Sequence, residues 1–233
     1  MNLFFHPEAN VGIKIQIDPA EATHIAKALR KKTGDEIHFT NGAGKLFVGQ
    51  LEVNKLEVFA NIISETQCQE LPVQLEIAVA PTKNNERLEW FVEKAVEIGI
   101  GNFAFLLCKH SERTHIKMER LDRIVVSAMK QSLKCYKPEL HQEMSLTEWV
   151  KNCNAQKKFI AHCRASADKK ILRDVIDKST PTAIAIGPEG DFSEEEIELA
   201  VKHGFVEVSL GNSRLRTETA ALAAVLTFDI VNQ

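Results

Sequence analysis

The chain has 233 residues, of which 44% are hydrophobic and 26% charged, and its formal net charge is -3. This length allows one large domain or two small ones, and the composition excludes intrinsic disorder as the default state. The slight acidity argues against bulk electrostatic binding of nucleic acid, but it leaves room for local basic patches.

The N-terminal part of the chain is predicted to form mostly strands. Short strands separated by close turns are typical of a small β-barrel. The polar segment 64–72, which ends in Pro72, is the predicted linker, and it divides the chain into domains of residues 1–70 and 71–233. Strands are expected over residues 14–18, 36–40, 46–53 and 56–63, with a short helix over 19–30 and a glycine-rich turn at 41–44.

After the linker, predicted strands alternate with predicted helices. This alternation indicates an α/β fold with a parallel sheet covered on both faces. The last helix is small and apolar nearly all round, which predicts burial against the sheet or against a second copy of the chain. Strands are expected over residues 75–80, 103–108, 159–163, 183–187 and 205–210, and helices over 85–98, 117–136, 169–177, 193–203 and 218–231.

Two loops carry the strongest functional signal, and each follows a predicted strand and precedes a predicted helix. They read Gly187-Pro188-Glu189-Gly190 and Leu210 to Ala220 (LGNSRLRTETA). Loops at the carboxyl ends of neighbouring parallel strands suggest one small-molecule site. The glycines of the first loop open the backbone to a ligand, or simply form a turn before the capping box Ser193-x-x-Glu196. Their spacing matches neither the Rossmann fingerprint nor a P-loop, which argues against a nucleotide-dependent oxidoreductase.

The second loop places an arginine where a helix would not favour it. Thr217 is a natural N-cap, and Glu218 suits the first turn of the following helix. Arg216 opposes the helix dipole, so we expect it to face an anion, a ligand or a carboxylate such as Glu189. His162, at the end of a predicted strand, is either a structural residue or part of the same site.

Basic residues form three clusters in this acidic chain. Each is either an ordinary solvated face or part of a track for RNA phosphates. The third recurs at roughly helical spacing, which predicts one face of a helix. The clusters are Lys27, Arg30, Lys31 and Lys32; Lys109, His110, Arg113, His115 and Lys117; and Lys130, Lys134 and Lys137.

The five cysteines show neither a C-x-x-C pair nor zinc-ligand spacing with histidine. Their odd number predicts reduced thiols in a cytoplasmic protein, and no metal site is expected. The first residues lack a secretory signal pattern, and no apolar run approaches the length of a membrane span, so no membrane partner is expected.

The two loops together resemble those of the bacterial small-subunit (16S) rRNA uridine-N3 methyltransferases of the SPOUT superfamily. Residues 29–42 are similar to the N-terminal PUA-like RNA-binding domain of that family, and residues 93–99 resemble the first helix of its large domain. The resemblance implies a PUA-like β-barrel at residues 1–70 and a SPOUT domain with a deep trefoil knot at residues 71–233. It also implies a homodimer with the site at its interface.

The resemblance further implies S-adenosyl-L-methionine as cofactor and the 16S rRNA of the small ribosomal subunit as substrate. Arg216 would stabilise negative charge on the uracil, and Glu189, Glu218 or a water would accept the N3 proton. The cofactor would contact Ala161, His162, Ile186, Gly187, Pro188, Glu189, Gly190, Leu210, Gly211, Leu215, Arg216, Thr217 and Ala220. RNA would contact Lys27, Arg30, Lys32, Arg113, Lys130, Lys134 and Lys137.

Two alternatives stay open at this point. A SPOUT enzyme could act on another RNA position or on a ribose hydroxyl, and a non-catalytic RNA-binding assembly factor could retain the fold. The chain also departs from the family pattern: the Glu-Gln-Ser-Gly-Arg segment of the family appears as Lys130-Gln131-Ser132-Leu133-Lys134.

Overall fold

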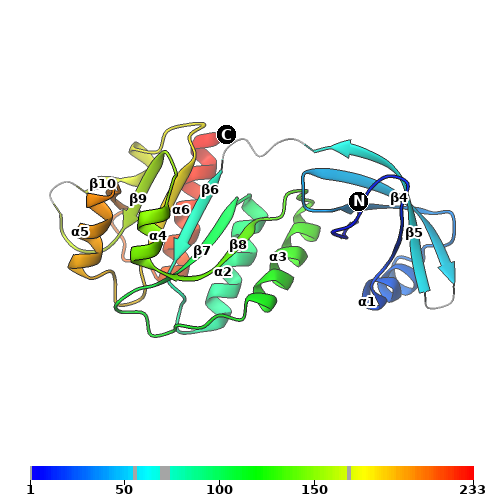
Figure 1. Cartoon of the computed structure of the whole chain (residues 1–233), viewed down its shortest axis with the longest axis horizontal. Helices are drawn as coiled ribbons and strands as arrows, with labels where there is room; N and C mark the ends of the chain where they lie inside the picture. Colours follow the sequence, from blue (N-terminus) through cyan, green and yellow to red (C-terminus); the bar gives the residue numbers. More distant parts are fainter. Residues whose placement is uncertain (1, 55–56, 69–73, 167–168) are drawn as a thin grey trace. The chain divides into compact units, whose positions relative to one another are not determined.

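The structure is a computed structural model that describes residues 2–54, 57–68, 74–166 and 169–233. The chain folds into two compact units (Figure 1). Residues 1–70 and 129–137 form the first unit, and residues 71–128 and 138–233 form the second. No local sequence pattern indicates that residues 129–137 pack with the N-terminal part.

The first unit is built on a five-stranded sheet in the order β1-β3-β4-β5-β2. Strand β1 runs parallel to β3, and the other neighbours are antiparallel. Alternate residues point into a core that contains Phe39, Phe47 and Leu51. Among the described residues, β1 and β2 do not pair with each other. The strands are β1 (Leu3–Phe5), β2 (Lys14–Gln16), β3 (Glu36–Thr40), β4 (Lys45–Asn54) and β5 (Glu57–Gln67).

The predicted helix of this unit is present but irregular. Helix α1 (Pro19–Thr23) is capped by Asp18, whose carboxylate accepts the Ala20 N–H, and it continues into the π-helical turn η1 (His24–Ala28). Strand β1 is not among the predicted strands. Strand β5 runs through residues 64–67, so the linker prediction is wrong for those residues, and residues 69–72 lie outside the described part of the chain.

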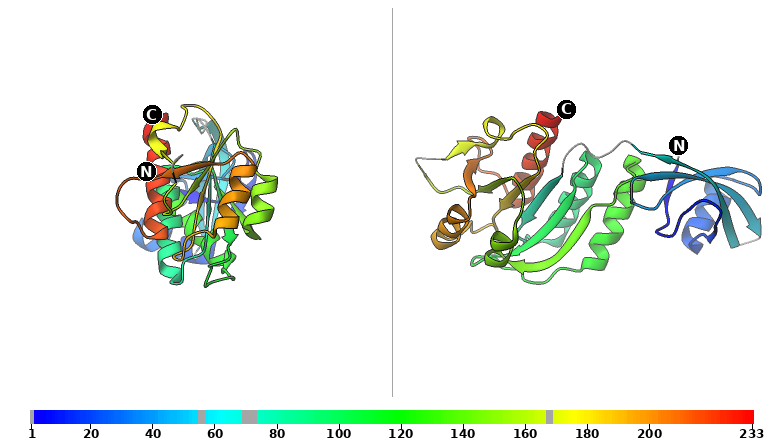
Figure 2. Two further views of the ribbon diagram at one scale, coloured as in Figure 1. Left: turned by 90° about the vertical axis from the view of Figure 1, so that its left-hand side faces the viewer. Right: turned by 45° about the horizontal axis from the view of Figure 1, so that its top comes forward.

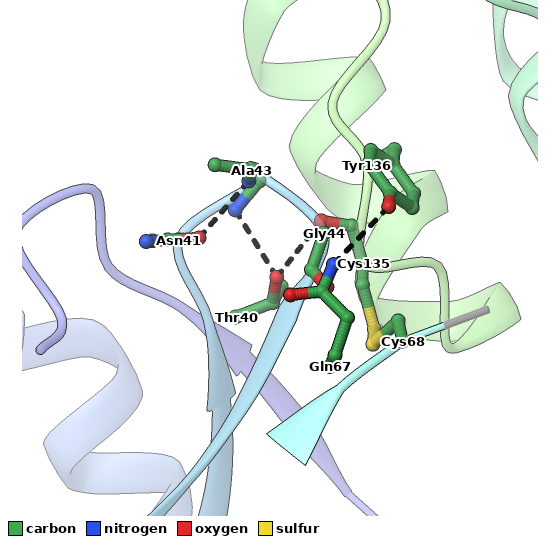
Figure 3. The surroundings of a disulfide bond; sticks show 9 residues. Thr40, Asn41, Ala43, Gly44, Gln67, Cys68, Cys135 and Tyr136 are labelled. Atoms are coloured by element: carbon green, nitrogen blue, oxygen red, sulfur yellow. Dashed lines mark hydrogen bonds between the residues drawn. A yellow bond between two sulfur atoms is a disulfide. The ribbon is translucent and has the colours of Figure 1, made fainter. Parts of the chain in front are cut away.

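A disulfide joins Cys68, directly after β5, to Cys135 (Figure 3). The prediction that all five thiols are reduced is therefore wrong for this pair, whereas Cys108, Cys153 and Cys163 are free. Backbone hydrogen bonds bring the two segments together: the Gly44 N–H donates to the Cys135 carbonyl at 3.0 Å, and the Gly44 carbonyl accepts the Cys68 N–H at 2.9 Å. A separation of 67 residues hides the pairing from any local pattern.

The second unit contains a seven-stranded sheet in the order β10-β12-β9-β11-β6-β7-β8, and every neighbouring pair is parallel. This confirms the predicted α/β fold with a parallel sheet. Central strand β11 is buried along its whole length. The strands are β6 (Leu75–Val79), β7 (Asn102–Leu107), β8 (Glu139–Ser145), β9 (Lys157–Ala161), β10 (Lys170–Ile171), β11 (Thr182–Ile186) and β12 (Val206–Ser209).

Helices cover both faces of this sheet (Figure 2). Helices α2 and α6 pack together on one face, and α4 and α5 pack on the other. Beneath α4 and α5 lies an apolar core that includes Trp149, Phe192 and Phe205. The helices are α2 (Asn85–Ile98), α3 (Met118–Ser132), α4 (Leu146–Asn152), α5 (Glu194–Lys202) and α6 (Thr217–Asn232).

Several predicted elements match and others do not. Helix α2 has the predicted bounds, and the capping box Ser193/Glu196 forms reciprocally at the start of α5. The helix predicted over residues 169–177 is wrong: that segment forms β10 and a short 3-10 turn, η2 (Leu172–Asp174). Strand β8 and helix α4 have no predicted counterparts. Strand β8 lies at the edge of the sheet and is polar and only partly buried, so its pattern is weak.

Helix α3 ends at Ser132, four residues before the predicted end. Leu133 adopts a φ of 59°, and the Lys134 N–H bonds to the Met129 carbonyl, as in a Schellman-type helix end. Lys134 and Lys137 therefore lie beyond the helix, and the helical spacing predicted for the third basic cluster is wrong.

Within the described ranges, no helix combines the length and apolar character that a bilayer crossing requires. Among the same residues, no group of histidine, cysteine and acidic side chains is arranged to hold a metal ion.

Candidate functional site

A cavity of about 770 Å³ opens at the carboxyl ends of β9, β11 and β12. Every residue predicted to contact the cofactor lines it. The wall also contains residues that sequence reasoning missed: Cys163, Arg164, Lys169, Asp191, Val208, Ser209, Asn212, Ser213 and Arg214.

Sheet topology explains why three loops distant in sequence meet here. Strand β12 pairs with β9, and β9 pairs with β11, all in parallel. Parallel neighbours end at the same edge of a sheet, so the loops that follow residues 161, 186 and 209 converge. The first of these loops was marked in the sequence only by His162.

Of the two roles expected for the glycines of the Gly187–Gly190 loop, the contacts around them favour the structural turn. A Cβ on Gly187 would lie 3.1 Å from the Phe192 ring, and one on Gly190 would lie 2.9 Å from the Cβ of His110. The bare side of each glycine thus faces the protein itself. These residues therefore permit close packing of the loop against Phe192 and His110.

Two polar side chains tie the three loops together, and neither role was visible in the sequence. Asp191 adopts a φ of 65°. Its carboxylate accepts two hydrogen bonds, from the Cys163 N–H at 2.8 Å and from the Phe192 N–H at 2.9 Å. The buried Thr217 hydroxyl donates to the Gly187 carbonyl at 3.1 Å. Thr217 is therefore not the N-cap of α6, as predicted; Arg216 occupies that position.

Arg216 and Glu189 both line the cavity, but they are not partners of each other. The exposed Arg216 guanidinium has no hydrogen-bond or ion-pair partner in the described part of the chain. Glu189 instead accepts the Lys83 N–H at 3.0 Å, and Arg113 donates to the Lys83 carbonyl at 2.8 Å. Arg113 thus reaches the backbone that holds Glu189 at the cavity wall.

Glu218 lies away from the cavity. It is 8% exposed and does not line the wall, and its Oε1 atom is 3.7 Å from Nε of Arg87 on α2. Its Oε2 atom is buried without a hydrogen-bond partner among the residues that the structure describes. The structure therefore separates this predicted proton acceptor from Glu189 and Arg216.

His162 is held in the cavity wall by Glu207 on β12. Its Nε2 atom lies 2.8 Å from Glu207 Oε2, and its side chain is 1% exposed. Burial lowers the pKa of His162, and nearby Lys169 lowers it further, while Glu207 and Asp191 act in the opposite direction. The histidine Nδ1 atom is buried and has no hydrogen-bond partner in the described part of the chain.

The predicted RNA-binding residues belong to both units. Lys27, Arg30 and Lys32 are exposed in the first unit. Lys130 forms an ion pair with Glu21 at 2.5 Å, and Lys137 lies over the Phe5 ring at 5.5 Å from its centroid. Lys134 also belongs to the first unit, whereas Arg113 belongs to the second.

Comparison with known families defines the class of this fold and site. Residues 69–228 match the RNA methyltransferase domain family, and residues 17–63 match the RNA methyltransferase PUA domain. The chain therefore belongs to the RNA methyltransferase family that these domains define.

Relatives and solved structures cover nearly the whole chain. A ribosomal RNA small subunit methyltransferase E from Buchnera aphidicola is 27% identical over 214 residues, 87% of this chain and 82% of the relative. One from Mesomycoplasma hyopneumoniae is 30% identical over 175 residues, which cover 72% and 74% of the two chains. The chain thus belongs, within its family, to the ribosomal RNA small subunit methyltransferase E group.

Three crystal structures have closely similar folds. A probable rRNA-methyltransferase from Porphyromonas gingivalis has a TM-score of 0.91 at 36% identity, covering 100% of this chain and 98% of that one. A putative methyltransferase from Legionella pneumophila, with bound S-adenosylmethionine, scores 0.87 at 30% identity over 99% and 97% of the chains. The Neisseria gonorrhoeae methyltransferase E, bound to the same cofactor, scores 0.85 at 26% identity over 100% and 98%.

Proposed function

We propose that this protein transfers a methyl group from S-adenosylmethionine to N3 of a specific uridine in the 16S rRNA of the small ribosomal subunit. The observation that carries the proposal is the cavity at the ends of β9, β11 and β12, which gathers the predicted cofactor residues around about 770 Å³. A volume of this order is typical of pockets that hold a small molecule such as S-adenosylmethionine. Two structural relatives that hold S-adenosylmethionine support the same assignment.

We assign residues 71–233 to the SPOUT methyltransferase domain and residues 1–70 to a PUA-like β-barrel that binds RNA in the cytoplasm. Strand β12 pairs with β9 and not with β11. This strand order favours a trefoil knot in the part of the chain that leads into α6. The exposed Leu226 and Ile230 on α6 favour a homodimer, because exposed apolar side chains on one helix suit burial against a second copy.

The residues of the cavity suit methyl transfer to a uracil nitrogen. The cofactor supplies a methyl group already activated by a positive sulfur, so the protein mainly has to align the reacting groups. Backbone groups of Gly187, Leu210 and Leu215 would hold the cofactor. The unpaired guanidinium of Arg216 would stabilise the negative charge that develops on the uracil oxygens.

The N3 proton needs an acceptor, and the geometry favours Glu189 over Glu218. Glu189 lies in the cavity wall, whereas Glu218 is buried beside Arg87. Uridine N3 lies on the Watson–Crick edge, so the target base must be unpaired or flipped out of its helix. The basic residues proposed to contact RNA phosphates are Lys27, Arg30, Lys32, Arg113, Lys130, Lys134 and Lys137.

A methyl-transfer assay tests the proposal. Labelled S-adenosylmethionine would be incubated with the protein and with small subunits or 16S rRNA from a strain that lacks this methylation, followed by nucleoside mass spectrometry. We expect N3-methyluridine at a single site. A different methylated nucleoside would overturn the N3 assignment, and cofactor binding without transfer to any RNA would favour the assembly-factor alternative.

A further inference from the structure

Buried His162, in the wall of the cavity, makes a polar contact with the partly buried Glu207. Glu207 does not itself line the cavity; it lies behind His162 on β12. Its Oε2 atom contacts His162 Nε2 at 2.8 Å, and its Oε1 atom accepts the Ser166 hydroxyl at 3.0 Å. Both carboxylate oxygens are therefore engaged by neighbouring side chains of the protein.

This contact determines which ring nitrogen of His162 carries the proton. An ionised carboxylate can only accept hydrogen bonds, so Nε2 must be the donor. Burial and the nearby Lys169 lower the pKa of His162, which favours the neutral ring near pH 7. In a neutral ring protonated at Nε2, the Nδ1 atom is a lone-pair acceptor.

That acceptor has no partner within the described protein. His162 Nδ1 is buried and makes no hydrogen bond, although its residue lines the cavity. A buried acceptor left unpaired costs roughly 1–3 kcal/mol, so a donor supplied by a ligand would remove this cost. Hydroxyl and amino groups are the donors that S-adenosylmethionine carries.

We propose that Glu207 is a positioning residue, which fixes His162 so that Nδ1 accepts a hydrogen bond from a hydroxyl or amino group of the bound cofactor. This inference rests on the proposed function, because it takes S-adenosylmethionine as the occupant of the cavity. Glu207 acts through His162 and touches no reacting atom.

The first test measures cofactor affinity by calorimetry for the wild-type protein and for Glu207→Gln. The amide that this substitution introduces can donate to Nε2 and place the proton on Nδ1, so we expect about tenfold weaker binding of S-adenosylmethionine. Ser166→Ala is the matched control, because it removes the other partner of Glu207 and leaves the histidine contact; we expect a change of less than about threefold.

The pH dependence separates positioning from a merely structural role. Protonation of His162 turns Nδ1 into a donor, so wild-type affinity should be constant above the pKa of His162 and fall below it. Burial and Lys169 lower the pKa of His162, whereas Glu207 and Asp191 raise it. In Glu207→Gln the neutral ring already carries its proton on Nδ1, so the acid limb should be lost and the affinity should stay low on both sides of this pKa, a result that a purely structural carboxylate would not produce.

A second measurement does not depend on any variant of Glu207. In protein labelled with ¹⁵N-histidine, the His162 signals, assigned by their loss in His162→Gln, should report a neutral ring protonated at Nε2. The Nδ1 resonance should shift when S-adenosylmethionine is added. Normal wild-type binding with an unmoved Nδ1 signal, or with unchanged affinity in Glu207→Gln, would overturn this inference alone. Absence of cofactor binding by the wild-type protein would overturn it together with the proposed function.

Discussion

Arg216 is the clearest candidate for transition-state stabilisation, because its guanidinium faces the cavity and lacks a partner among the described residues. We expect Arg216→Ala to reduce turnover by about 10²-fold or more. In other enzymes, the removal of one hydrogen-bond donor that stabilises transition-state charge has an effect of this size. Cofactor affinity should change by less than about threefold, since the charge develops on the uracil.

Single-turnover methyl transfer and calorimetry measure the two effects separately. Arg173→Ala, which removes an arginine with a 72% exposed side chain outside the cavity, is the control and should leave both quantities unchanged. Equal losses of affinity and turnover in Arg216→Ala would contradict the charge-stabilising role.

The two candidate carboxylates can be separated in the same way. Because Glu189 lines the cavity and Glu218 does not, we expect Glu189→Gln to lower turnover more than about tenfold and Glu218→Gln less than about threefold. Both substitutions keep side-chain size, so thermal unfolding should confirm that each variant is folded. A larger loss in Glu218→Gln would reverse the assignment.

The end of α3 is one of the places at which a non-glycine residue carries local backbone strain. Leu133 is 44% exposed and adopts a φ of 59°, a conformation that costs an L residue roughly 1–2 kcal/mol. Leu133→Gly removes this cost and adds roughly 0.5–1 kcal/mol of chain entropy, so we expect a net gain of up to about 1 kcal/mol.

Thermal unfolding measures this gain as a rise in Tm of about 2 °C. Leu133→Ala is the matched control, because it also shortens the side chain but keeps the Cβ that causes the strain. An equal gain in both variants would show that the exposed leucine side chain, and not the backbone conformation, is responsible.

Element prediction succeeded where amphipathic or apolar periodicity was strong. Helix α2, strand β3 and the capping box before α5 have local signals that tertiary packing does not oppose. Strand β8 and the segment of β10 failed because both lie at sheet edges, where partial exposure weakens the pattern. Pairing with a neighbouring strand decides the conformation of such segments.

At the level of the whole molecule, the Cys68–Cys135 disulfide closes a long loop within the first unit. A closure across 67 residues is expected to stabilise the fold by about 4 kcal/mol in the chain-entropy description. We therefore expect a reducing agent to lower the unfolding midpoint of the first unit, and Cys135→Ser to unfold at the same lower midpoint with or without the reductant.

Alkylation under denaturing conditions without reductant, followed by intact mass measurement, should label Cys108, Cys153 and Cys163 only. Cys163→Ser, which removes an exposed free thiol, serves as the control and should keep the response to reductant. Labelling of all five cysteines before reduction would contradict the disulfide.

The sequence by itself determined the parallel α/β unit, most of the element positions and two of the three loops that form the cavity. These features depend on local periodicity and on short motifs, which neighbouring residues encode directly. Only the tertiary structure decided that the loop after β9 joins the other two, that Glu207 stands behind His162, and that Glu218 turns toward Arg87. It also decided the Cys68–Cys135 pairing and the reason for the glycines at 187 and 190. Each of these depends on contacts between residues far apart in the chain, which strand order and packing create and local sequence does not record.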